Sequence, residues 1–250
     1  PELRPQIYNH EAMPYEGCIL GYFTVWQGPE NNVCDSLNIQ KRNEVLIGWS
    51  KDGFHWNREN KKPFLPVSED FHAWNAGNVQ STAGSPLIVG DSLYFYVSGR
   101  YNSKPKHDSN FATGLAMLRR DGFVSMRAGR KEGYIEIKTQ IPANGNYLFV
   151  NADVKGTLAV EVLDDNGQPM EGFTKKDCIS MKKSDKTKQM ISWEKHPGVT
   201  SLVGKTVRLK FYLNQADIYA FWISAWQTGE SLIYRRMRCF RMLINVVTIL

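Results

Sequence analysis

The sequence lacks any apolar run long enough to cross a lipid bilayer. Its longest such run, MLINVVTIL at 242–250, has nine residues, whereas a membrane-spanning helix needs about 20. We therefore expect no membrane span.

Cysteine patterns for metal binding are also missing. The four cysteines, Cys18, Cys34, Cys178 and Cys239, are far apart, and none belongs to a Cys-x-x-Cys or Cys/His pair. This spacing argues against a zinc site, and we identify no cofactor and no metal ligand set. Buried thiols are the simplest interpretation, although a single disulfide stays open. The cysteines therefore do not identify the compartment.

A strong charge bias is lacking once the last 20 residues are set aside. The formal net charge is +6, and residues 231–250 hold four arginines and no acid, which leaves +2 for residues 1–230. Lysine and arginine elsewhere are interleaved with acids rather than gathered in one stripe. This distribution does not favour nucleic-acid binding.

No secretory signal is present, but the chain starts at Pro1 rather than at a methionine. The missing signal is therefore uninformative. We expect the chain to be a piece of a longer protein.

Helical periodicity is almost absent through residue 225, and turn residues recur along the chain. Between the turns lie strand-like segments. Within 93–98, Leu93, Phe95 and Val97 share one face and the residues between them share the other, which predicts a half-buried strand. The near-continuous apolar run EVLIGWS at 44–50 is typical of an inner strand. We predict an all-β protein.

A weak internal repeat refines this prediction. WSKDGFHW (49–56) and LRRDGFVSM (118–126) share a basic-Asp-Gly-Phe core, and each follows an aromatic strand, LGYFTVW (20–26) or LYFYVSG (93–99). Repeats of this size, built from strands and turns, are typical of propeller blades. Asp and Gly supply the turn backbone. We expect the phenylalanine that follows them to pack between neighbouring blades.

The pattern changes near residue 130. Strand-like segments separated by NG, KG and DNG turns follow, among them YLFVNAD, TLAVEVLD and TVRLKFYLNQADIYAFWIS. We predict about two C-terminal blades of a β-propeller in 1–130 and a β-sandwich in 131–226.

Residues 227–250 do not continue the strand pattern. The segment RRMRCFRMLINVV has some amphipathic character, which would suit a membrane surface or a partner helix. A non-native chain end is the simpler interpretation, and we favour it.

Taken together, the motifs resemble the five-bladed β-propeller glycoside hydrolases, a group that includes fructan- and arabinan-cleaving enzymes of the family-32 and family-43 type. The resemblance is carried by YNHEAMPYEGCILGYFTVW, RNEVLIGWSKDGFHW and WNAGNVQSTAGSPLIVGDSLYFYVSGR. The second half resembles the β-sandwich that follows the propeller in bacterial relatives of these enzymes. The resemblance implies a secreted or periplasmic glycosidase with a carbohydrate substrate and three acidic residues around a central pocket. With only about two blades present, the acids of the first blades would lie upstream of Pro1.

Glycoside hydrolysis requires two carboxyl groups across the scissile bond, one of which donates a proton. The pKa of the donor must be raised by burial or by a neighbouring carboxylate. Glu16, in PYEGCILGYF at the start of an inner-looking strand, fits this role and is similar to the third acid of the family. The alternative is a partly exposed acid at a strand end. Glu11 is the second catalytic candidate, which would position Glu16 or raise its pKa.

Sugar sites combine an aromatic platform with planar amides. The connection FHAWNAGNVQS at 71–81 supplies both, and its candidate substrate-binding residues are His72, Trp74, Asn78 and Gln80. The alternative is an Asn-rich turn with Trp74 in the core. His10 is a candidate for binding a sugar hydroxyl, with a turn histidine as the simpler interpretation. Arg100 would bind a carboxylated sugar or pair with an acid.

Other residues of the same motifs are assigned structural roles. Asp52 and Asp121 belong to the two Asp-Gly-Phe turns, and the tryptophans Trp26, Trp49 and Trp56 are assigned to the blade core.

We therefore expect a glycoside hydrolase in which Glu16 is the general acid and the nucleophile or base comes from blades outside this chain. Two alternatives stay open: a carbohydrate-binding protein without catalysis, and a truncated product with exposed sheet edges. The sequence identifies neither the sugar nor the linkage.

Overall fold

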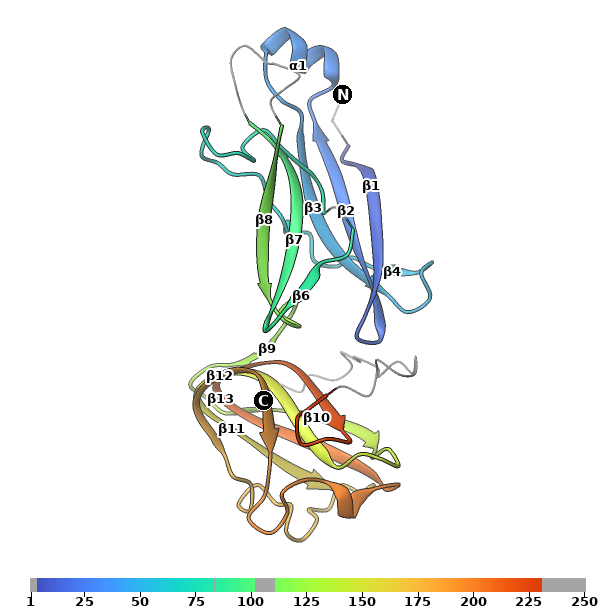
Figure 1. Cartoon of the computed structure of the whole chain (residues 1–250), viewed down its shortest axis with the longest axis vertical. Coiled ribbons are helices and arrows are strands. Elements are labelled where there is room, and N and C mark those ends of the chain that lie inside the picture. Colours follow the sequence, from blue (N-terminus) through green and yellow to red (C-terminus); the bar gives the residue numbers. More distant parts are fainter. Residues whose placement is uncertain (1–3, 83, 102–110, 231–250) are drawn as a thin grey trace. The chain divides into compact units, whose positions relative to one another are not determined.

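The computed structural model describes residues 4–82, 84–101 and 111–230 (Figure 1). These residues lie almost entirely in strands and the turns between them, so the prediction of an all-β protein is confirmed. The predicted tail falls mostly in 231–250, outside the described residues. By its internal contacts the chain divides between Leu118 and Arg119 into two compact units, unit 1 and unit 2.

One short helix of unit 1 was not predicted. The helix α1 spans Asn31–Leu37 and ends at Asn38, which adopts the left-handed conformation. Asparagine tolerates this conformation better than most residues and is a common helix terminator. The helix is too short to give the 3.6-residue pattern by which helices are found in a sequence.

Unit 1 begins with a four-stranded antiparallel sheet, sheet A. Its strands, in order, are β1 (Gln6–Tyr15), β2 (Cys18–Gly28), β3 (Arg42–Ser50) and β4 (Trp56–Asn57). Tyr15 pairs with Cys18, and Ile19 pairs with Ser50. The β1–β2 turn and the β3–β4 turn therefore lie at the same end of sheet A.

The second sheet of unit 1, sheet B, is organised around β7. Its strands are β5 (Asn78–Ser81), β6 (Leu87–Val89), β7 (Ser92–Arg100) and β8 (Phe111–Arg119), and the other three all pair with β7. Leu93, Phe95 and Val97 are buried, whereas Tyr96 is half exposed. The predicted alternation of residues 93–98 is therefore confirmed.

Aromatic side chains join the two sheets of unit 1. The ring of Tyr22 on β2 lies 5.8 Å from the ring of Phe95 on β7, and Phe64 lies 6.0 Å from Tyr22 and 5.5 Å from Phe95. Thr24 on β2 adds a hydrogen bond of 2.6 Å to the carbonyl oxygen of Gln80. Burial raises the pKa of the Tyr22 hydroxyl, with smaller contributions from Cys18 and Glu11. This core fixes which face of each sheet points inward.

The two Asp-Gly-Phe turns occupy similar places, each after a long strand. Phe54, the phenylalanine of the first turn, is 86% exposed, so the prediction that it packs between blades is wrong for this copy. Trp56 covers the sheet instead, because its ring lies against the backbone of Gly21. The second turn belongs to unit 2, where the Asn151 side-chain amide donates to the Asp121 carboxylate at 3.3 Å.

Unit 2 is one curled, five-stranded antiparallel sheet (Figure 1). Its strands are β9 (Met126–Ala128), β10 (Gly133–Gln140), β11 (Tyr147–Leu163), β12 (Met181–Ile191) and β13 (Thr206–Ser224), and a 3-10 turn spans Thr200–Leu202. The order is β10-β13-β11-β12, and β9 also pairs with β13. The predicted sandwich region is thus hydrogen-bonded as a single sheet.

The segments YLFVNAD and TLAVEVLD, predicted as separate strands, are both part of β11. The KG pair between them forms an irregularity in the strand register rather than a turn. A side chain at Gly156 would place its Cβ 2.4 Å from the carbonyl oxygen of Asn214. Gly156 therefore allows β13 to approach and the strand to bend without ending.

The core of unit 2 fills the inside of this curl. Trp193 and Phe211 are almost completely buried, and the Trp193 indole N–H donates to the carbonyl oxygen of Val160 at 3.0 Å. Phe173 packs edge-on against Trp193 and stacks on His196 at 4.2 Å. One aromatic cluster thus ties the long β12–β13 connection to the sheet.

Arg119 secures the start of unit 2. Its guanidinium donates to the Asn151 side chain at 2.7 Å, pairs with Asp185 and lies 4.9 Å from the centre of the Tyr219 ring. The segment 119–130, assigned from the sequence to the last blade, therefore clusters with the second unit.

The structure describes Cys18, Cys34 and Cys178. Cys34 and Cys178 are buried, and Cys18 is partly buried. The predicted burial is confirmed for Cys34 and Cys178.

We predict that Phe211→Ala destabilises unit 2 by about 3–5 kcal/mol, because it removes a large, fully buried ring and leaves a cavity. Chemical denaturation followed by circular dichroism would measure this loss. Ile179→Ala is the matched control, since Ile179 is 59% exposed and its truncation should change stability by less than about 0.5 kcal/mol. Equal losses in both variants would contradict the assigned core.

Candidate functional site

Two turns at one end of sheet A form the candidate site. The first is the β1–β2 turn, in which Glu16 and Gly17 connect the paired residues Tyr15 and Cys18. Both turn residues have positive φ, 43° at Glu16 and 93° at Gly17. Such two-residue turns match the twist of the strands they connect and are usually built from Asn-Gly or Asp-Gly.

Glu16 is therefore an unusual residue for its position. A non-glycine residue in the left-handed region costs roughly 1 kcal/mol, and asparagine would fit the turn with less strain. The Glu16 side chain is partly buried. Strain of this kind, once observed, is a reason to ask what the residue does.

The second turn, between β3 and β4, is organised by Asp52. One carboxylate oxygen of Asp52 accepts the backbone N–H groups of Phe54 at 2.9 Å and His55 at 2.8 Å. The other oxygen lies 2.7 Å from His55 Nδ1. The hydroxyl of Ser50 accepts the N–H of Gly53 at 2.9 Å. These bonds agree with the structural role predicted for Asp52.

The interaction between Asp52 and His55 shifts the pKa of both side chains. The N–H of His55, its side chain and the N–H of Phe54 hold the pKa of the Asp52 carboxyl well below its usual range. The hydrogen bond and charge of Asp52 raise the pKa of His55. Because Asp52 occupies Nδ1, His55 presents Nε2 to solvent.

An open depression of about 450 Å³ lies beside this turn. Its lining residues are Trp49, Lys51, Asp52, His55, Trp56 and Asn57. Trp49 and Trp56 are both partly exposed. Trp49 pairs with Leu20 and Trp56 pairs with Ser50, so the two indoles lie on opposite faces of sheet A. The remaining lining residues add an ammonium, an imidazole and a carboxamide.

The indole of Trp56 rests on a built support. A Cβ atom at Gly21 would lie 2.4 Å from the Trp56 ring, so only glycine leaves room for it. The indole N–H of Trp56 donates to the carbonyl oxygen of Gly53 at 3.0 Å. His10 meets Trp56 edge-on at 4.6 Å and stacks on Phe23 at 4.2 Å. His10 thus lies in β1 beside the depression rather than in a turn.

Glu11 lies on the opposite face of sheet A. It pairs with Tyr22, whose ring points into the core of unit 1. The Glu11 carboxylate accepts the Ser81 hydroxyl at 2.7 Å and the Thr82 N–H at 3.0 Å, and it also accepts the Thr82 hydroxyl. These bonds connect β1 to β5 and use Glu11 as a tie between the two sheets.

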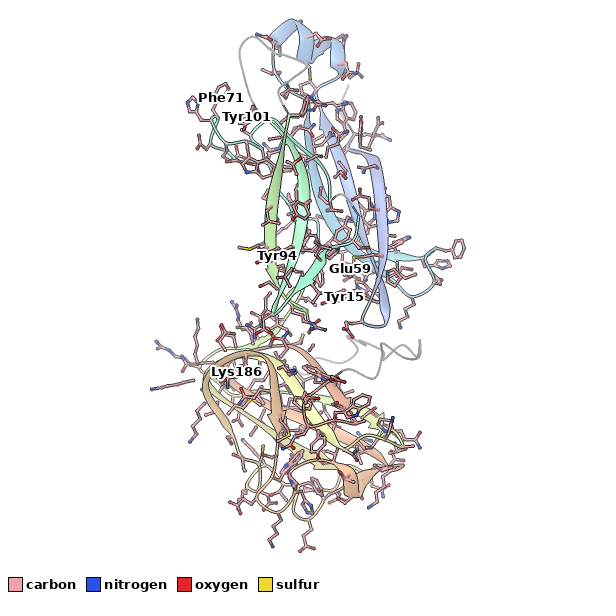
Figure 2. All side chains as sticks on the ribbon, in the orientation of Figure 1. Tyr15, Glu59, Phe71, Tyr94, Tyr101 and Lys186 are labelled. Atoms are coloured by element: carbon pink, nitrogen blue, oxygen red, sulfur yellow. The ribbon has the colours of Figure 1, made fainter. Side chains whose placement is uncertain are left out.

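The 71–81 segment lies towards the other end of unit 1. Figure 2 shows Phe71 and Tyr101 near the α1 end, whereas Tyr15, next to Glu16, lies at the opposite end. His72 is exposed, with its ring 5.5 Å from that of Phe71. The structure therefore does not bring His72 together with Glu16.

Trp74 packs onto sheet B. A Cβ atom at Gly99 or Gly114 would lie 2.4 Å or 2.3 Å from the Trp74 ring, so two glycines of neighbouring strands accommodate the indole. This contact agrees with the alternative of a tryptophan that packs in the core.

The remaining candidates hold the backbone of unit 1. Asn78 is fully buried, and its amide donates to the carbonyl oxygen of Lys41 at 3.0 Å. The main-chain oxygen of Gln80 accepts the hydroxyl of Thr24, and that of Arg100 accepts the N–H of Gly77 at 2.8 Å. Of the substrate-binding candidates, only His10 lies beside the depression.

Sequence reasoning missed Lys51, His55 and Asn57, and it assigned Trp49 and Trp56 to the core. The signal was the motif WSKDGFHWN (49–57), in which tryptophans flank a tight turn. It also missed Glu44, a buried carboxylate that accepts hydrogen bonds from Gln27 at 2.7 Å and from Arg42 at 3.0 Å. Glu44 and its partners stabilise β3 at the other end of the strand.

No protein-family model and no curated protein matches this chain. Within residues 4–82, 84–101 and 111–230, no group of three or more His, Cys, Asp or Glu side chains is arranged to hold a metal ion. The described helices are also too short to cross a membrane. The function must therefore be argued from the site itself.

We predict that His55 titrates above the ordinary histidine pKa of about 6.5, and that Asp52→Asn moves its pKa back down. Because the pKa of His55 is raised, the Asp52–His55 pair makes its full contribution to the stability of the turn when the pH is below the ordinary histidine pKa. This contribution is lost as the pH rises through the pKa of folded His55. NMR titration of the histidine ring signals would measure both values.

Phe54→Ala is the control for this titration, because Phe54 belongs to the same turn but is exposed. Its truncation should leave the pKa of His55 unchanged. An unshifted His55 in the parent chain, or no response to Asp52→Asn, would contradict the hydrogen bond between the two side chains.

Proposed function

We propose that unit 1 binds a carbohydrate in the depression beside the β3–β4 turn. The observation that carries the proposal is the pair of partly exposed indoles, Trp49 and Trp56, that line this depression together. Sugar rings present flat C–H faces that stack on indole surfaces, and their hydroxyls then bond to polar groups around the rim.

The rim offers such groups. Lys51 contributes an ammonium with three donors, and His55 contributes the ring nitrogen that Asp52 leaves open. Asn57 contributes a planar amide, whose N–H group also donates to Glu59 at 3.1 Å. Aromatic side chains with a small number of polar groups around them are the general pattern of a sugar site.

Glycoside hydrolysis is the second candidate function, and the backbone of Glu16 favours it. Glu16 is kept in a strained conformation at the same end of sheet A as the depression. A general acid held there would protonate the leaving oxygen of a bound sugar. The partner carboxylate would be an acid other than Glu11 and Asp52, since both of these are engaged in structural hydrogen bonds. Carbohydrate binding is therefore the first candidate function and glycoside hydrolysis the second.

We predict that Trp49→Ala weakens binding of fructan- or arabinan-derived oligosaccharides at least about tenfold, which corresponds to about 1.4 kcal/mol. Isothermal titration calorimetry with each oligosaccharide measures this change. Trp49→Phe should keep most of the affinity, because it retains an aromatic face. Phe54→Ala, an exposed aromatic of the same turn outside the depression, should bind like the parent chain.

The same samples test the second candidate. If released sugars appear and Glu16→Gln lowers their rate at least about 10²-fold while binding is retained, Glu16 acts as the general acid. If Glu16→Gln changes neither rate nor affinity, hydrolysis by Glu16 is excluded. Equal binding by Trp49→Ala and the parent chain would overturn the carbohydrate site.

A further inference from the structure

His10, Phe23, Trp56 and Arg58 form one cluster on the outer face of sheet A. The His10 ring stacks on Phe23 with an interplanar angle of 8° and meets Trp56 at 89°. The Phe23 ring lies 5.4 Å from that of Trp56. The guanidinium of Arg58 lies 4.8 Å from the centre of the Phe23 ring. Phe23 is buried beneath these groups.

Two glycines make the cluster possible. A Cβ atom at Gly21 would lie 2.8 Å from His10 Nε2 as well as 2.4 Å from the Trp56 ring. One at Gly48 would lie 2.8 Å from Cγ of Arg58. Strands β2 and β3 therefore leave a flat bed of backbone on which the histidine, the indole and the arginine stem lie.

We propose that His10 is a positioning residue for the carbohydrate site, in which its neutral imidazole holds the Trp56 indole in place. The inference rests on the proposed function for its effect on sugar binding. Its effect on Trp56 itself is independent of that function.

The charge state of His10 decides whether it can do this. A neutral imidazole stacks on Phe23 and offers its edge to the indole, whereas an imidazolium would have to lose water and approach the cation Arg58. Burial lowers the pKa of His10, and Arg58 lowers it further, whereas Glu11 on the same strand opposes the shift. No other charged group is identified around His10 among the described residues. The cluster is therefore intact at neutral pH and loosens as pH falls through the pKa of folded His10.

The depression thus borders two histidines, His10 and His55, whose pKa values are shifted in opposite directions. The pKa of His55 is raised by Asp52, and the pKa of His10 is lowered. Both residues reach Trp56, His10 through its ring and His55 through the turn that accepts the indole N–H. The environment of the Trp56 indole should therefore change in two separate steps as the pH is varied.

The test follows the indole N–H resonance of Trp56 by NMR between about pH 4 and pH 8. The parent chain should show two steps, one on each side of the ordinary histidine pKa of about 6.5. His10→Phe, which keeps a stacking ring without a proton, should remove only the lower step. His55→Gln should remove only the upper step. A lower step that persists in His10→Phe would overturn the proposal.

Sugar binding supplies a second readout. Affinity for a fructan- or arabinan-derived oligosaccharide should fall with the lower step in the parent chain and lose this acid dependence in His10→Phe. At neutral pH, His10→Ala should weaken binding at least about threefold because the edge-on support is lost, whereas His10→Phe should restore it.

The two proposals fail differently. If no oligosaccharide binds to the parent chain, the proposed function fails, and the Trp56 resonance still decides whether His10 positions the indole. If binding depends on Trp49 but His10→Phe keeps the acid dependence of the parent chain, only the role of His10 is overturned. Gly21→Ala, which should displace both rings, is the second variant in case His10→Ala does not fold.

Discussion

The contact between Tyr22, Phe64 and Phe95 is the interaction on which the rest of unit 1 depends. A sheet must bury its apolar face against another element, and these three rings pack between the two sheets. Because side chains alternate along a strand, burying Tyr22 decides the direction of its neighbours. Phe23 must then point to the outer face, where His10 and Trp56 cover it.

The same alternation separates the two glutamates that the sequence offers as a catalytic pair. Glu11 lies opposite Tyr22 and faces the inside of unit 1, where Ser81 and Thr82 saturate its carboxylate. Glu16 lies in the turn at the end of the hairpin. The two carboxylates therefore serve different parts of the molecule. A carbohydrate-binding site needs only the aromatic depression, whereas hydrolysis needs a second acid, a role for which Glu11 is not placed.

Local patterns predicted the local features well. The alternation in 93–98, the strand at 44–50 and the structural turn at Asp52 all follow from neighbouring residues. The continuity of β11 did not, because the bend at Gly156 depends on the approach of Asn214 from another strand. The function of Glu11 depends on Ser81, 70 residues away. No periodicity in the sequence reports a contact of that kind.

The site was missed for a related reason. Trp49 and Trp56 look like core residues in the sequence, and each is in fact partly buried. Both line a depression at the turn between them, where Asp52 holds the turn closed and Gly21 leaves room for the Trp56 ring. The 71–81 segment had the composition of a sugar site, but its tryptophan fills the space above Gly99 and Gly114. Composition alone cannot distinguish a platform from a packed ring.

The most direct test of the carbohydrate site is an NMR titration of the indole N–H resonances with a fructan- or arabinan-derived oligosaccharide. The account predicts that the resonances of Trp49 and Trp56 shift together and saturate, while that of the buried Trp193 stays fixed as an internal reference. Shifts confined to Trp74, or no shift in any indole at millimolar oligosaccharide, would contradict it.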